Sequence, residues 1–112
     1  MISKEQASKN PVVAINTAVW SGKHTYLILN FKDGTAGIAK QIAPPENTTK
    51  TTMSLGVKRG RETVTVYFDE VENMGHAGFK ECYKMIFEKW KGNFSSGRKK
   101  FDKFKESVPA AN

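Results

Sequence analysis

A net charge of +7 on 112 residues fits one small basic domain and leaves little room for a second. A hydrophobic fraction of 38% with a charged fraction of 26% is typical of a packed globule and excludes a disordered chain. The single cysteine excludes an internal disulfide, and no apolar run reaches the roughly 18 residues of a membrane span. We therefore expect a cytosolic protein with no membrane contact, in the host cytoplasm if viral and in the nucleus if eukaryotic.

The first part of the chain predicts two strands. Residues 1–10 are polar, and we expect them to form a flexible N-terminal segment that ends at Pro11. β-branched and aromatic residues then predict a strand over residues 12–20. Residues 25–31 predict a second strand that is apolar at consecutive positions, so it should lie at the centre of a sheet or beneath a partner.

A hairpin and a long loop follow. Asp33 and Gly34 lie between two strand-like runs and indicate a type I′ turn, because both residues tolerate the positive φ that this turn requires. The run after the turn predicts a third strand over residues 36–42. Residues 43–51 contain two prolines and many polar side chains, and we expect a mobile loop there.

A second hairpin with a cationic tip is predicted next. Residues 53–57 and 62–68 alternate between apolar and polar side chains, as in strands with one buried face. The tip between them carries three cations, namely Lys58, Arg59 and Arg61. The three acidic residues within 69–72 should form a link to the following helix, turned away from any polyanion because they would repel it.

Residues 79–90 show the clearest periodicity of the chain, that of an amphipathic helix. Its apolar stripe consists of Phe79, Cys82, Tyr83, Ile86, Phe87 and Trp90. The stripe is wider than strands of small residues can cover, so we expect part of it to meet a second copy. The residues assigned to this dimer interface are Tyr83, Ile86, Phe87 and Trp90.

These elements together predict an α+β homodimer with an antiparallel sheet of four to five strands followed by one long amphipathic helix. We expect a single domain over residues 11–94 and a basic tail over residues 95–112. Catalysis is not expected. Cys82 lies on the apolar stripe, His24 and His76 are far apart in sequence, and no phosphate-binding loop precedes a helix. We therefore expect no enzyme, no cofactor and no metal ion.

Positive charge beside aromatic rings is typical of proteins that hold unpaired bases and their phosphates. Phe31 and Lys32 form such a pair at the first hairpin, although Phe31 fits the core equally well. Trp20 could also stack on a base or pack in the core, and we favour the core. The candidate nucleic-acid contacts are Lys23, Tyr26, Phe31, Lys32, Lys40, Lys58, Arg59 and Arg61.

The order of elements, the segment Tyr26-Leu27-Ile28-Leu29-Asn30-Phe31-Lys32-Asp33-Gly34 and the basic run from Lys58 to Arg61 resemble the positive-cofactor-four transcriptional coactivators. That family comprises single-stranded DNA-binding homodimers of ββββα chains from eukaryotes, bacteria and phages. The resemblance covers about residues 23–90 and implies that Phe31, Lys32 and the basic run occupy the family's DNA-contacting positions. The chain departs from the family at Leu29, where a basic residue is common, and at residues 40–42, which replace an aromatic-containing segment.

We therefore expect a single-stranded DNA-binding protein of low sequence specificity that acts in replication, recombination or transcription. Two alternatives remain open at this point. One is a protein-interaction module, for example a viral inhibitor of an acidic host protein, and the other is an RNA-binding protein.

Overall fold

The computed structural model describes residues 1–21, 24–47, 49–90 and 98–99. The elements in chain order are α1 (Lys4–Lys9), β1 (Val12–Ser21), β2 (His24–Phe31), β3 (Ala36–Ile42), β4 (Met53–Arg59), β5 (Glu62–Gly75), α2 (Phe79–Trp90) and β6 (Arg98–Lys99). Five strands and the long helix lie where the sequence predicts them. None of the helices in these ranges is long and apolar enough to cross a membrane.

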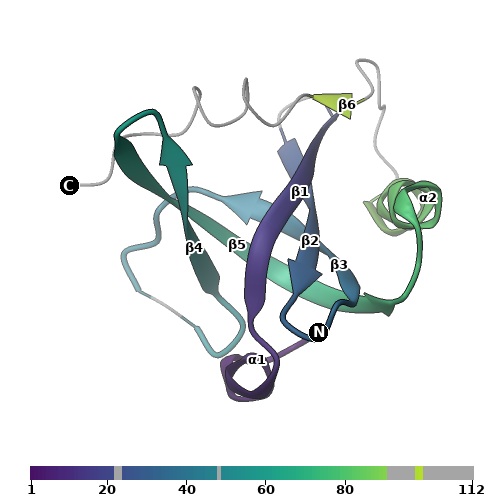
Figure 1. The fold of residues 1–112 in the computed structure, drawn as a ribbon, viewed down its shortest axis with the longest axis horizontal. Helices are drawn as coiled ribbons and strands as arrows, with labels where there is room; N and C mark the ends of the chain where they lie inside the picture. Colours follow the sequence, from purple (N-terminus) through teal and green to yellow (C-terminus); the bar gives the residue numbers. More distant parts are fainter. Residues whose placement is uncertain (22–23, 48, 91–97, 100–112) are drawn as a thin grey trace.

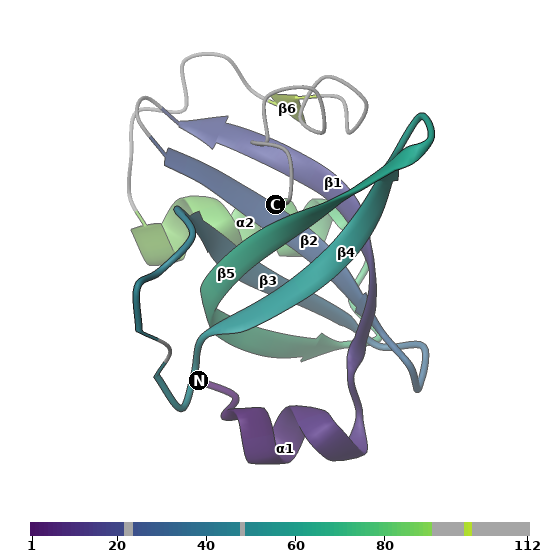
Figure 2. The same ribbon diagram turned by 90° about the vertical axis from the view of Figure 1, so that its left-hand side faces the viewer.

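The strands form one antiparallel sheet in the order β4-β5-β3-β2-β1-β6, which confirms the predicted α+β class. The sheet curls so strongly that β1 also contacts β4, and the first three strands and the β4–β5 hairpin surround a common interior (Figures 1 and 2). β2 lies between β1 and β3, in the central position that its consecutive apolar residues predict.

The interior of the curl holds the larger of two core clusters. β2 contributes Leu27, Leu29 and Phe31, which face buried side chains of β5 such as Val66 and Phe68. Burial of these apolar side chains is the main source of stability for a domain of this size. The alternation of Val64, Val66 and Phe68 fixes which face of β5 turns inward, and therefore which face turns out to solvent.

The N-terminal segment is a helix, where the sequence predicts a flexible segment. α1 lies beneath one end of the curl, and Ile2 and Ala7 pack against the interior cluster (Figure 2). The backbone N–H of Ile2 donates to the carbonyl of Val71 at 2.8 Å. The signal for this helix is a capping box, in which Ser3 and Gln6 each accept a hydrogen bond from the other's backbone N–H.

The outer face of β2 and β3 is covered by α2. Cys82 and Ile86 are fully buried there against Tyr26, Ile28 and Ile38. The Trp90 ring stacks on the Tyr26 ring with 4.6 Å between centroids. An ion pair of 2.8 Å between Lys89 Nζ and Glu72 Oε1 joins the end of the helix to β5.

Two local features differ from the sequence-based expectations. β5 continues through the acidic residues to Gly75, because Val71 reaches the interior cluster and Glu72 pairs with the helix. A bulge with positive φ at Glu70 accommodates this path. The β2–β3 turn is not type I′, since Gly34 has a positive φ and Asp33 does not. It is instead a longer hairpin loop in which Gly34 alone takes the left-handed conformation.

Candidate nucleic-acid interface

The two cationic hairpin tips do not come together. Ala36, which begins β3 just after the Lys32 turn, pairs with Gly75 at the end of β5. Lys58 and Arg61 flank the start of β5 at Glu62, which is the opposite end of the same strand. Lys32 therefore lies far from the other cations, and a single site that contains both tips is ruled out. Lys32 and the cations of residues 58–61, which the sequence analysis lists together as candidate contacts, therefore belong to different ends of the sheet.

Two of the predicted aromatic contacts belong to the core. Phe31 is only 2% exposed, and a Cβ built on Gly37 would lie 2.5 Å from its Cε2 atom, so the ring lies directly on the β3 backbone. Tyr26 is 4% exposed beneath Trp90. Burial, and secondarily the negative charge of Glu70, raises the pKa of the Tyr26 hydroxyl. Neither ring can stack on a base in this conformation, which corrects their assignment to the binding surface.

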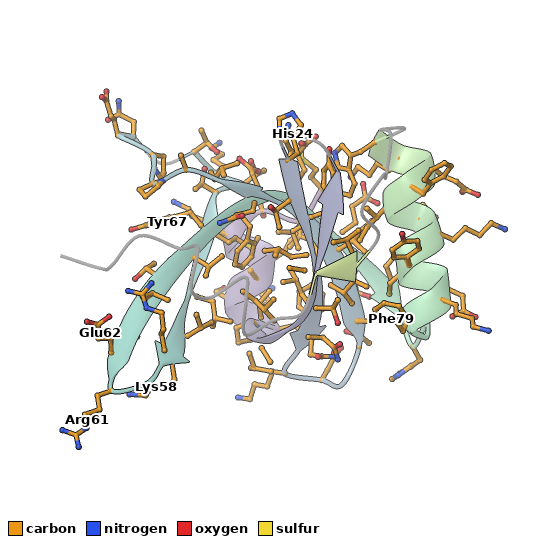
Figure 3. All side chains as sticks on the ribbon, turned by 90° about the horizontal axis from the view of Figure 1, so that it is seen from above. His24, Lys58, Arg61, Glu62, Tyr67 and Phe79 are labelled. Atoms are coloured by element: carbon orange, nitrogen blue, oxygen red, sulfur yellow. The ribbon has the colours of Figure 1, made fainter. Side chains whose placement is uncertain are left out.

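A different surface combines an aromatic ring with cations. Because Val64, Val66 and Phe68 turn inward, the residues between them point outward, and cross-strand partners on β4 share that outward face. We call this surface the ribbon face, and it consists of Ser54, Gly56, Lys58, Thr63, Thr65 and Tyr67. Figure 3 shows Tyr67 pointing away from the interior, with Lys58 and Arg61 farther along the same hairpin.

Tyr67 is the binding candidate that the sequence-based prediction did not include. It lies directly opposite Ser54 on β4 and Ile42 on β3, and it is half-buried. The signal was present in the alternation of residues 62–68, where Tyr67 is the one aromatic residue out of phase with the buried valines. An aromatic residue on the solvent face of a predicted strand is therefore as strong a candidate as one at a hairpin tip.

The cations at the tip of the β4–β5 hairpin differ in whether an acidic side chain pairs with them. Arg59 Nη2 and Glu62 Oε2 form an ion pair of 3.0 Å, which offsets both charges. Lys58 and Arg61 are exposed, and within the described ranges neither has an ion-pair partner. The tip formed by residues 59–62 is a two-residue turn in which Gly60 has a φ of +62°, the pattern of a type II′ turn.

The other end of the ribbon face is acidic. Lys40 is half-buried and lies opposite Asp69, which follows Tyr67 by two residues and so turns the same way. The Asp69 carboxylate accepts hydrogen bonds from its neighbour's backbone N–H at 2.7 Å and from the Thr52 hydroxyl at 3.4 Å. We expected this acidic segment to face away from a polyanion. Asp69 borders the ribbon face instead and limits its cationic part to the outer half of the hairpin, whereas Glu72 pairs with Lys89 on α2.

Most of the predicted dimer interface packs on its own sheet. Ile86 lies on the side of α2 that faces the sheet and is fully buried, which removes it from the set of interface residues. Tyr83 and Trp90 are half-buried and pack against the same helix-side cluster, because β1 contributes Val19 to that cluster and widens the surface the stripe can cover. Phe87 is 51% exposed.

The remaining candidates lie outside the described residues. These are Lys23, the Trp20 side chain and the basic tail, apart from the backbone of β6. Across the described ranges, no group of three or more His, Cys, Asp and Glu side chains is placed to hold a metal ion. A cavity of about 310 Å³ lies between α1 and the first residues of β1 and β4, and Lys4 is the one titratable side chain among those that line it.

The ribbon face can bind a flexible anion that carries planar groups. Lys58 and Arg61 supply positive charge, Tyr67 supplies an aromatic ring, and hydroxyl groups separate them. The resemblance to the positive-cofactor-four family rests on the residues quoted above alone. Comparisons with protein-family models, with curated proteins and with solved structures found no match to this chain.

Proposed function

We propose that the protein binds single-stranded DNA on the ribbon face with low sequence specificity. The observation that carries this proposal is the placement of Tyr67, Lys58 and Arg61 on one exposed hairpin arm that α2 leaves uncovered (Figure 3). A stacked base contacts the Tyr67 ring, while the two cations contact phosphates of the nucleotides that run from there toward the hairpin tip. Both kinds of contact are available with every base, so they give affinity without sequence preference.

Binding begins with electrostatic capture. The basic tail over residues 95–112 includes five Lys and Arg but only two Asp and Glu, so it supplies a large share of the net charge. β6 pairs Arg98 with Val19 and Lys99 with Ala18 at the β1 edge. Neutralising phosphates releases counterions whatever the base sequence, so the tail adds affinity without specificity. Such a protein would protect or remodel unpaired DNA during replication, recombination or transcription.

We propose further that two copies associate through the outer side of α2. Phe87 is 51% exposed on this helix, and a large exposed aromatic ring favours contact with an apolar partner. A dimer would present two ribbon faces to one strand, which raises the effective concentration of the second face once the first is occupied.

The test is a fluorescence-anisotropy titration at several salt concentrations with single-stranded DNA, duplex DNA and RNA of equal length. We expect the single strand to bind more tightly than the duplex, with a steep dependence of affinity on salt. Tyr67→Ala should weaken binding by about 1 to 3 kcal/mol, whereas Tyr67→Phe, which keeps the ring, should not. Absence of affinity for all three ligands at low salt would contradict the proposal and favour a protein partner. Tighter binding of RNA than of single-stranded DNA would show that the ligand of the ribbon face is RNA.

A further inference from the structure

Of the strand glycines Gly37, Gly56 and Gly75, Gly56 is the one that the fold constrains least. Gly75 needs glycine because its φ is +61°, and Gly37 needs it because a Cβ would meet the Phe31 ring and the Glu72 carbonyl, the latter at 2.9 Å. Gly56 is less constrained than either of these. Its φ lies outside the left-handed region, and a Cβ there would meet only the Thr63 methyl group, at 3.1 Å.

Glycine in a strand carries a cost when nothing demands it. It forfeits side-chain packing and loses more backbone entropy on folding than any other residue. In some sheets an aromatic side chain from the next strand lies over such a glycine and compensates for the loss. Tyr67 lies diagonally across from Gly56, but no atom of its ring is within 4 Å of a Cβ built there. Among the residues that the structure describes, the Thr63 methyl group is therefore the one group that crowds this position.

Gly56 lies at the centre of the ribbon face. Gly56 pairs with Thr65, and the outward residues before and after it on β4 are Ser54 and Lys58. Within the ribbon face, Tyr67 supplies the aromatic ring and Lys58 the cation. A glycine inside a strand can mark a site where a ligand approaches the backbone closely.

We infer that Gly56 is a positioning residue, which leaves room for one unpaired base to lie flat on the β4 backbone beside Tyr67 while Lys58 contacts its phosphate. The inference rests on the proposed function and deepens it, because it assigns a base to a defined place on the ribbon face. A side chain at position 56 would raise the base from the sheet and separate it from the backbone. The phosphate contacts, which lie at the ends of the side chains around it, would remain.

The test uses Gly56→Ala and Gly56→Thr in the full chain, with Ala14→Thr as the matched control. Ala14 is an exposed residue of β1 outside the ribbon face. The control therefore introduces the same threonine side chain at an exposed strand position where no base is expected. Each protein is titrated with a short oligothymidylate and with an abasic strand of equal length. Thermal melting of each variant measures folding separately.

We expect Gly56→Thr to weaken binding of oligothymidylate by about tenfold, as expected for one base that no longer stacks, and Gly56→Ala to weaken it less. Affinity for the abasic strand should stay unchanged in both variants, and Ala14→Thr should bind both ligands as wild type does. Melting temperatures should change little, because the strand preference of β-branched residues opposes the crowding of the Thr63 methyl group. A folding defect would instead lower the affinity for both strands equally.

Three results would overturn the inference. Unchanged affinity of Gly56→Thr for oligothymidylate, with wild type binding normally, would refute it and leave the proposed function intact. Equal losses of affinity for the thymidine and abasic strands would show that no base lies over Gly56. A change from dimer to monomer in light scattering, with no selective loss for thymidine, would identify the ribbon face as a contact between copies. Failure of the wild type to bind either strand would refute the proposed function first.

Discussion

The substitution Phe31→Ala separates a core role of this ring from a binding role. Phe31 ends β2, is 2% exposed and packs in the interior cluster. Deleting a buried phenylalanine side chain typically costs about 3 to 5 kcal/mol, from the transfer free energy of the ring and from the cavity left behind. Native domains are stable by only about 5 to 15 kcal/mol, so this cost would be a large fraction of the total.

The close approach of Phe31 to β3 allows a second, independent test of whether this ring belongs to the core. Gly37→Ala would place a Cβ 2.5 Å from Phe31 Cε2 and 2.9 Å from the Glu72 carbonyl oxygen. Overpacking of this kind costs about 1 to 3 kcal/mol. Part of that cost should vanish when Phe31 is already alanine, because the clash with the ring is then absent, while the clash with the carbonyl persists. The double variant should therefore be more stable than the sum of the single effects predicts.

Urea denaturation followed by circular dichroism measures these differences, with Val13→Ala as the control for an exposed apolar side chain outside both proposed surfaces. We expect a decrease in stability below about 1 kcal/mol for Val13→Ala, because this side chain is 52% exposed. A decrease for Phe31→Ala as small as that of the control, accompanied by weakened DNA binding of the folded variant, would refute the assignment of Phe31 to the core.

Three further outcomes follow from the geometry of the charges and of α2. The double substitution Lys58→Gln with Arg61→Gln should reduce the slope of log affinity against log salt by roughly 0.7 for each phosphate that is no longer neutralised. Lys32→Gln, at the opposite end of the sheet, should leave that slope nearly unchanged, and an equal effect would contradict the ribbon face. The pKa of Glu72 is lowered, chiefly because Lys89 on α2 donates a hydrogen bond to its carboxylate. The stabilisation of the folded state by the Glu72 carboxylate is therefore present at neutral pH. It should disappear as the pH falls below the ordinary glutamate value of about 4.3, and Glu72→Gln should remove this pH dependence from urea midpoints. Phe87→Glu should convert dimers to monomers in light scattering, and a wild-type monomer at micromolar concentration would exclude the proposed association.

The sequence predicts those parts of the fold in which one periodicity dominates. The 3.6-residue stripe from Phe79 to Trp90 and the alternation from Glu62 to Phe68 have one interpretation each, and both elements form there. α1 is harder to predict because a single turn or two of helix has no apolar period to detect, although its capping box is legible in the sequence. The end of β5 is hard to predict because acidic residues disfavour strands, whereas tertiary contacts of Val71 and Glu72 override that preference.

The candidate site is harder still to predict, because exposure depends on which face of each strand the rest of the chain covers. Phe31 beside Lys32 has the composition of a binding pair, but its side chain turns into the curl. Tyr67 has no basic neighbour in sequence, and its cationic neighbours arrive through the β4–β5 register. The separation of Lys32 from Lys58 likewise follows from strand order, since β3 pairs with β5 and not with β4. Local sequence does not encode that order.

The most direct test of the central claim is a map of backbone amide chemical shifts, recorded by two-dimensional ¹H–¹⁵N NMR while a short oligothymidylate is added. Our account predicts that the shifts that change most within the described ranges are those of the β4–β5 hairpin, from Ser54 to Lys58 and from Thr63 to Tyr67. The amides of α1 and of the turn at Lys32 should change little, because both lie at the other end of the sheet. Changes concentrated at that turn or on α1, with the hairpin unaffected, would contradict the assignment of single-stranded DNA binding to the ribbon face.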